Sequence, residues 1–220
     1  MASLYFYYGA MGSSKTANAL MARYNYIERG QKVLMLKPAM ENRDGEKTIK
    51  SRIGLSAECM YVEEFIKYVK ENWEVMRKLD EEFNKYPGCF TDEQIYSAYG
   101  DLEDCSKYDA VIIDEAQFMT EEQVEFMSDI VDLYNIPVLC YGLRADFQNK
   151  LFPGSAKLLA IADNIQEIKT VCWCGKKAIC NARYNENGIV RVGRQVELGA
   201  NDKYVALCRR HFKEGKLNND

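Results

Sequence analysis

The chain alternates between short apolar runs and longer stretches in which apolar residues recur with helical spacing. Runs of apolar or alternating residues predict strands at 4–8, 32–36, 108–113, 136–142 and 164–171. Helical spacing predicts helices at 17–29, 62–85, 120–134 and 155–162. The first strand–helix–strand unit predicts a right-handed crossover between parallel strands. We therefore expect an α/β fold, with a parallel sheet flanked by helices.

Two stretches interrupt this alternation. Residues 41–55 are polar and are predicted to form a loop. Residues 62–107 combine a charged helix that has one narrow apolar face, a break at Pro87-Gly88 and a short second helix at 91–99. We interpret 62–107 as a helical insertion that is structural or contacts another subunit.

The first strand leads into a small Gly/Ser-rich loop that precedes the first helix. The residues of this phosphate loop are Gly9, Ala10, Met11, Gly12, Ser13, Ser14, Lys15 and Thr16. In the P-loop pattern, backbone N–H groups surround phosphate oxygens, while Lys15 would supply a positive charge and Thr16 a hydroxyl ligand for Mg²⁺. Ser14 stands where the pattern has its second glycine, and it tolerates a positive φ less well. The alternative is a plain Gly/Ser turn between a strand and a helix.

Two acids directly follow the predicted strand at 108–113. Ligands of parallel sheets bind at the carboxyl ends of the strands, so Asp114 and Glu115 are expected near the phosphate loop. An Asp at this place commonly holds Mg²⁺, directly or through water, and the adjacent Glu115 is suited to be a general base. The alternative is an Asp that ends the strand and caps the next turn. Together with the phosphate loop, the acids predict a P-loop NTPase-like (RecA-like) sheet that binds ATP.

The loop at 143–154 carries two aromatic residues beyond the end of a predicted strand. Phe147 and Phe152 could stack on a flat ligand, because binding residues are often placed on such loops. Alternatively, the two rings anchor the loop onto the core. The residues alone leave both interpretations open.

Composition narrows the classes of function. The chain has 220 residues, 47% of them hydrophobic, which suits one α/β domain with a small appendage. Its net charge of −4 argues against nucleic acid as a direct partner. No apolar run is long enough to span a membrane, and the N-terminus has no secretory signal. We expect a cytoplasmic protein without a membrane partner.

Three of the eight cysteines gather near the C-terminus with the only histidine. Cys172 and Cys174 sit on a predicted tight turn, and Cys208 and His211 form a C-x-x-H pair. Three thiolates and one imidazole are the ligands of a closed, structural zinc site. The alternative is four buried or free residues that happen to cluster. We expect a nucleotide-binding domain at 1–170 and a small zinc-binding domain at 171–220, which would depend on the metal for folding.

In this combination the chain resembles type II thymidine kinases, the tetrameric, zinc-containing family, nearly from end to end. The segments that carry the resemblance are the phosphate loop, Asp-Glu-Ala-Gln-Phe at 114–118, 51–55, 141–147 and 203–211. Two features depart from the family pattern. Ser14 replaces a glycine that many members carry, and residues 70–107 are longer than in typical bacterial members.

The resemblance implies roles for individual residues. ATP would bind at the phosphate loop, with Asp114 toward Mg²⁺, Glu115 as the base and Ala116 and Gln117 completing that motif. Arg43 would approach the transferred phosphate, although by composition alone it is as readily a solvated surface arginine. The side chains implied to line the thymine pocket are Phe118, Phe147, Phe152 and Tyr204. Tyr204 would lie on the lasso loop, which holds the base largely through backbone hydrogen bonds.

The expected activity is transfer of the ATP γ-phosphate to the 5′-hydroxyl of thymidine, and of deoxyuridine as well. The family also implies a homotetramer and inhibition by the end product, thymidine triphosphate. One competing class is a P-loop ATPase that acts on another substrate or on nucleic acid, in which Glu115 would activate water. Another is a non-catalytic zinc module with a vestigial nucleotide site. A GTPase is disfavoured, because no Asp follows Asn149-Lys150 to read guanine.

Overall fold

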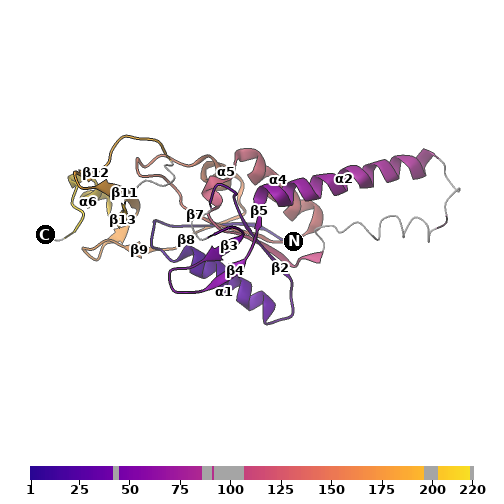
Figure 1. Ribbon diagram of the computed structural model, residues 1–220, viewed down its shortest axis with the longest axis horizontal. Helices are drawn as coiled ribbons and strands as arrows, with labels where there is room; N and C mark the ends of the chain where they lie inside the picture. Colours follow the sequence, from indigo (N-terminus) through magenta and orange to yellow (C-terminus); the bar gives the residue numbers. More distant parts are fainter. Residues whose placement is uncertain (42–44, 86–90, 92–106, 196–202, 219–220) are drawn as a thin grey trace.

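Six parallel strands form the central sheet of the computed structural model, in the order β5-β2-β6-β7-β1-β8 (Figure 1). The structure describes residues 1–41, 45–85, 91, 107–195 and 203–218. The strands of the sheet are β1 (Leu4–Tyr8), β2 (Val33–Lys37), β5 (Met60–Tyr61), β6 (Ala110–Ile113), β7 (Val138–Gly142) and β8 (Asn164–Glu167). The predicted α/β fold with a parallel sheet is confirmed.

Helices cover both faces of this sheet, but unequally. The helices are α1 (Lys15–Ile27), α2 (Val62–Lys85), α4 (Glu121–Tyr134), α5 (Pro153–Ile161), α6 (Arg209–Glu214) and the short η2 (Ala116–Phe118). One apolar core joins α2, α4 and α5 to one face of the sheet, and a smaller core joins α1 to the other (Figure 1). No helix in the described part of the chain is long and apolar enough to cross a membrane.

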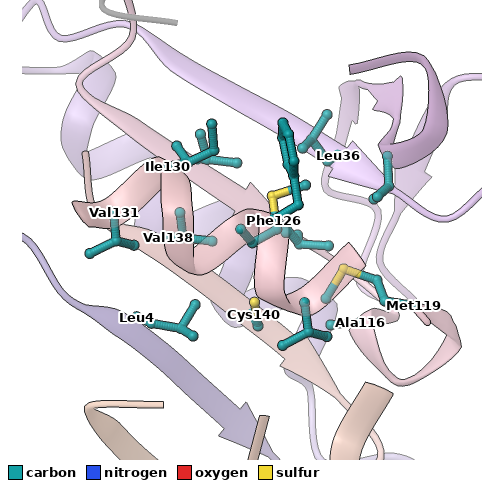
Figure 2. Packing of buried hydrophobic residues seen from close by; sticks show 14 of the residues in the cluster. Leu4, Leu36, Ala116, Met119, Phe126, Ile130, Val131, Val138 and Cys140 are labelled. Carbon is teal, nitrogen blue, oxygen red and sulfur yellow. The ribbon is translucent and has the colours of Figure 1, made fainter. Parts of the chain in front are cut away.

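The larger core is built from alternate residues of the central strands. Phe126 and Ile130 of α4 lie in one buried cluster with Val138 and Cys140 of β7 and Leu4 of β1 (Figure 2). These side chains are at most 6% exposed. Burying a side chain of this size contributes about 1.5–3 kcal/mol, which holds α4 against β7 and β1.

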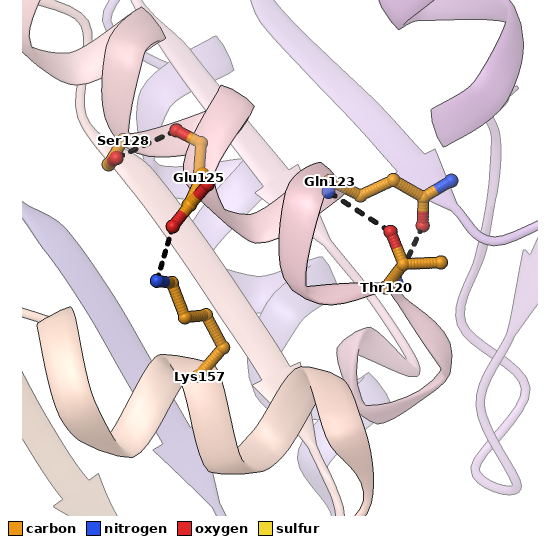
Figure 3. Close-up of polar contacts among 5 residues, drawn as sticks. All are labelled: Thr120, Gln123, Glu125, Ser128 and Lys157. Atoms are coloured by element: carbon orange, nitrogen blue, oxygen red, sulfur yellow. Dashed lines mark hydrogen bonds and ion pairs between the residues drawn. The ribbon is translucent and has the colours of Figure 1, made fainter.

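Polar contacts fix the start of α4 and its packing on α5. Thr120 and Gln123 stand three residues apart, which predicts a capping box, and it is present: the Thr120 hydroxyl accepts from the Gln123 N–H and the Gln123 side chain accepts from the Thr120 N–H (Figure 3). Lys157 of α5 forms an ion pair with Glu125 of α4. These contacts position the helices that follow the two acids.

Two predictions about the polar and edge segments are wrong. Residues 41–55 do not form a plain loop, because β3 (Thr48–Lys50) pairs with β4 (Ser56–Glu58) in a hairpin. Each of these three-residue strands buries only one side chain, Ile49 in β3 and Ala57 in β4, so the sequence shows no period that predicts a strand. The predicted strand at 164–171 is also divided, since β8 ends at Glu167 and β9 (Thr170–Val171) pairs elsewhere. Only residue 91 of the predicted helix at 91–99 is among the described residues.

The C-terminal part has its own small sheets and core. Its elements are β9 (Thr170–Val171), β10 (Lys177–Ala178), β11 (Cys180–Asn185), β12 (Gly188–Ile189), β13 (Lys203–Leu207) and α6. The alternating residues from Ile189 to Leu198 predict a hairpin arm, but over the described part of this stretch the pairing with β11 ends at Ile189. Two residues later the chain is held against α6 instead: the Arg191 guanidinium lies over the Phe212 ring, 4.5 Å from its centroid. It also donates to the Phe212 carbonyl.

Candidate functional site

The phosphate loop turns sharply between β1 and α1. Gly12 has φ of 73° and Ser14 has φ of 60°, so the chain takes left-handed backbone at both. A serine in this region is uncommon and costs some backbone strain. Gly9 is required for a different reason: a Cβ there would lie 2.4 Å from the Ile168 carbonyl oxygen. The tight curvature that phosphate binding needs is therefore built in, with Ser14 accommodated at the second glycine position.

Lys15 points back into the loop that it follows. Its side chain is only 9% exposed, and its ammonium donates to the Ala10 carbonyl at 3.0 Å. Longer contacts reach the Gly9 carbonyl and the Ser13 hydroxyl, both at 3.4 Å. A buried ammonium that is held by weak carbonyl acceptors can exchange them for phosphate oxygens, which carry full charge.

Asp114 lies at the carboxyl end of β6 and meets the start of α1. It is 4% exposed, and its carboxylate accepts from the Thr16 hydroxyl. Burial and the neighbouring charge of Glu115 raise the pKa of the Asp114 carboxyl to about 7, although Thr16 and Lys15 oppose the shift. Among the described residues, its Oδ1 has no hydrogen-bond partner. A buried carboxylate oxygen left in this way, beside a threonine hydroxyl, fits a divalent cation such as Mg²⁺.

The raised pKa makes a prediction for stability. Between about pH 4 and pH 7 the folded chain holds a proton on Asp114 that the unfolded chain has lost, so the free energy of unfolding falls as pH rises through this window. We expect metal-free Asp114→Asn to melt a few degrees above the wild type at pH 8, and the difference to shrink toward pH 4. Thermal melts at both pH values measure this, with the exposed-site variant Asp129→Asn as a control. A difference that is equal at both pH values would contradict the expectation.

Glu115 and Gln117 begin the short helix η2. Glu115 has left-handed backbone, with φ of 52° and ψ of 36°, and its side chain is half-buried. Ala116 and Gln117 are buried, and the Gln117 amide donates to the Glu115 carboxylate. The residues that sequence analysis placed in one motif thus lie together at the ends of β6 and β7.

The aromatic side chains are more buried than a stacking surface would be. Phe147 is 1% exposed, and the Arg183 guanidinium covers its ring at 4.2 Å from the centroid. Phe152, 5% exposed, meets the half-buried Phe118 edge to face at 5.7 Å. Tyr204 lies on β13 directly opposite Arg183 of β11. The structure therefore brings Phe118 and Phe152 together, whereas Phe147 lies under Arg183 and Tyr204 is the cross-strand neighbour of Arg183.

The four predicted zinc ligands form one cluster. The ligand atoms of Cys172, Cys174, Cys208 and His211 all lie within 4.8 Å of one another. Burial alone would raise the pKa of the Cys172 thiol. Hydrogen bonds from the backbone of Cys174 and Cys208 outweigh this effect and lower the pKa to about 6, which favours the thiolate. The donor set fits a closed tetrahedral Zn²⁺ site. Trp173 stacks on the His211 ring, with centroids 4.0 Å apart.

Sequence analysis missed a residue that joins the C-terminal part to the phosphate loop. The Asn181 side-chain oxygen accepts from the Met11 N–H at 2.8 Å, and its NH₂ donates to the Ala145 carbonyl at 2.7 Å. Asn181 is 5% exposed. An asparagine in a strand carries no motif, so only the burial of a polar side chain among three separate segments could have identified it. Arg43, the remaining predicted site residue, lies outside the described residues.

Known proteins resemble this chain over almost its whole length. The family model described as thymidine kinase matches residues 2–83 and 91–212. A thymidine kinase of Novosphingobium aromaticivorans is 43% identical over 215 residues, which are 97% of this chain and 98% of that protein. A thymidine kinase of Legionella pneumophila (strain Paris) is 45% identical, covering 98% and 91%. A third, from Mannheimia succiniciproducens, is 42% identical and covers all of both chains.

Proposed function

The chain belongs to the thymidine kinase family, and on that premise we propose that it transfers the γ-phosphate of ATP to the 5′-hydroxyl of thymidine, and of deoxyuridine as well. Membership confirms the resemblance found in the sequence, and with it a kinase that phosphorylates thymidine. The family implies ATP and a divalent metal ion as its co-substrate and cofactor.

One observation carries the proposal. The segment after β1 and the segment after β6 meet at one edge of the sheet, where Thr16 donates to Asp114 and the charge of Lys15 acts on the same carboxylate. A phosphate-binding loop, a cation ligand and an acid that can accept a proton are thereby assembled from distant parts of the chain. Phosphoryl transfer needs little more than such positioning and neutralisation of charge.

The residues divide the work of the reaction between them. Backbone N–H groups of the phosphate loop and the Lys15 ammonium hold the β- and γ-phosphates, and Arg43 approaches the transferred group. Thr16 and Asp114 hold Mg²⁺, which supplies positive charge to the phosphates when bound. Glu115 accepts the proton of the attacking 5′-hydroxyl. Zn²⁺ at the cysteine–histidine cluster is structural, because its four protein ligands leave no open position.

The thymine pocket is proposed around Phe118, Phe147, Phe152 and Tyr204. Because Phe147 and Phe152 are buried, we assign them to a rigid apolar wall of the pocket. Phe118 is half-buried and is therefore the ring best placed to contact a base. Backbone groups of the lasso loop read the polar edge of the ring. A site that pairs such an edge rejects a base with the reversed donor and acceptor pattern, because its own polar groups are left unpaired.

This selectivity gives the test of the function. Incubated with Mg²⁺–ATP and each deoxynucleoside in turn, the protein is expected to convert thymidine to its monophosphate. We expect kcat/KM for deoxycytidine to be lower by about 10⁴-fold, as for other sites that read a substrate through hydrogen bonds. Detection of the monophosphates by chromatography measures both.

The same assay separates the competing class. ATP hydrolysis that a polynucleotide stimulates, with no nucleoside monophosphate formed, would identify an ATPase and reject the proposal. Equal use of deoxycytidine and thymidine would reject the thymine pocket while leaving the phosphate half of the site intact.

We also propose that the chain forms a homotetramer. Parallel sheets are normally covered on both faces. On the face of the sheet that carries α1 and the β3–β4 hairpin, however, a groove of about 860 Å³ stays open. Met21 and Tyr24 of α1 line it and are 48% and 58% exposed, and Leu55 beside them is 39% exposed. A second copy would cover this surface.

Thymidine triphosphate, bound at the thymidine site, is the proposed feedback inhibitor. The proposed location of the protein is the cytoplasm.

A further inference from the structure

We propose that Gln117 is a positioning residue that holds the Glu115 carboxylate in the orientation needed to accept the proton of the substrate hydroxyl. This inference rests on the proposed role of Glu115 as the general base. The resemblance groups Gln117 with the nucleotide-binding residues, and its contacts in the structure give it this narrower task.

The Gln117 amide connects the ends of two strands. Its Nε2 donates to Oε2 of Glu115 at 2.5 Å, just after β6. Its Oε1 accepts from the Leu143 N–H at 2.8 Å, just after β7. The side chain is 1% exposed, so it has no access to water as an alternative partner. Because the Leu143 N–H fixes which end of the amide is the acceptor, the NH₂ end must face Glu115.

Leu143 is itself held from the other side. The Ser155 hydroxyl, near the start of α5, donates to the Leu143 carbonyl at 2.6 Å. Ser155 is fully buried. A continuous chain of hydrogen bonds therefore runs from α5 through Leu143 and Gln117 to the Glu115 carboxylate. Such chains hold a polar group more firmly than a single contact to solvent does.

Two glycines make room for this arrangement. A Cβ on Gly142 would lie 2.8 Å from Oε1 of Gln117 and 3.0 Å from its backbone nitrogen. A Cβ on Gly154 would lie 2.6 Å from the Met119 carbonyl oxygen and 2.8 Å from that of Ala116. Only residues without a side chain allow η2 to lie this close to β7 and α5. The two glycines therefore set the position of the Gln117 backbone.

The consequence for Glu115 is a defined orientation. Holding a half-buried glutamate on left-handed backbone in one orientation reduces the conformational entropy that it loses when it meets the substrate. The bond from Gln117 Nε2 to Oε2 sets the direction in which the Glu115 carboxylate faces. Reacting groups that are misplaced by about 1 Å can lose about 10²-fold in rate.

Two variants separate anchoring from orientation. Gln117→Glu has the same shape and keeps an acceptor for the Leu143 N–H, but it replaces the donor to Glu115 by a second negative charge. Gln117→Met has a similar length and makes neither bond. We expect kcat to fall by about 10–10²-fold in both, while KM for ATP and for thymidine changes by less than about threefold. Gln31→Met, after α1, is the control with unchanged kcat.

The double variant Glu115→Gln/Gln117→Met tests whether Gln117 acts through Glu115. If it does, the double variant has the kcat of Glu115→Gln alone, because the group to be positioned is already lost. Multiplied losses would overturn the inference, as would Gln117→Glu and Gln117→Met with wild-type kcat. A near-normal kcat in Glu115→Gln by itself would instead overturn the base assignment, so the two failures are distinguishable.

Discussion

Replacing Glu115 by Gln is expected to lower kcat for thymidine phosphorylation by about 10²–10⁴-fold. Glutamine has the same size and cannot accept the proton of the 5′-hydroxyl. ATP and thymidine should bind with near wild-type affinity, because the substitution keeps the size of the side chain and leaves the phosphate loop, Phe147 and Phe152 unchanged on other segments. Single-turnover kinetics measure the chemical step, and calorimetric titration measures the two affinities.

The matched control is Glu121→Gln, which removes an exposed acid from the first turn of α4. Its turnover should equal that of the wild type. Turnover of Glu115→Gln within about tenfold of the wild type would reject Glu115 as the base. A loss of ATP affinity in parallel with kcat would assign Glu115 to nucleotide binding instead.

Loss of the metal is expected to unfold the C-terminal part, residues 170–218, before it affects the phosphate loop. Its small core relies on the four ligands, and a structural zinc site contributes about 10–16 kcal/mol of binding free energy at pH 7. Elemental analysis should find one zinc per chain. In a Trp73→Phe background, chelation should change the emission of Trp173, because this indole stacks on His211.

Cysteine variants give the control. Cys208→Ser should lose the zinc, whereas Cys180→Ser should keep it, since Cys180 is buried in the same core but lies outside the cluster. Normal zinc content and thymidine binding in Cys208→Ser would contradict the assignment. Unfolding of the C-terminal part should affect the phosphate loop only through loss of the hydrogen bond that the Met11 N–H donates to Asn181.

The aromatic loop shows where interpretation of the sequence stopped. Phe147 and Phe152 were equally consistent with a stacking surface and with anchors on the core. Their burial in the structure, and the Arg183 guanidinium over Phe147, favour rings that anchor the loop onto the core over an open stacking surface. Arg183 comes from a strand 36 residues beyond Phe147, and no spacing rule connects two such positions.

By itself the sequence determined the alternation of strands and helices, the phosphate loop, the acids after β6, the capping box and the cysteine–histidine set. Each depends on residues that are close along the chain, where period and spacing are direct consequences of backbone geometry. It did not reveal the β3–β4 hairpin, because one buried residue in a three-residue strand makes no period.

Only the tertiary structure decided which distant groups meet. The side chain of Asn181 reaches the Met11 N–H across 170 positions, and the Gln117 amide reaches Leu143 across 26. Such pairs are selected by the need of each buried donor and acceptor for a partner, and that need exists only once the chain has folded and excluded water. For the same reason, Asp114 has a raised pKa only because the folded chain buries its carboxyl beside Glu115.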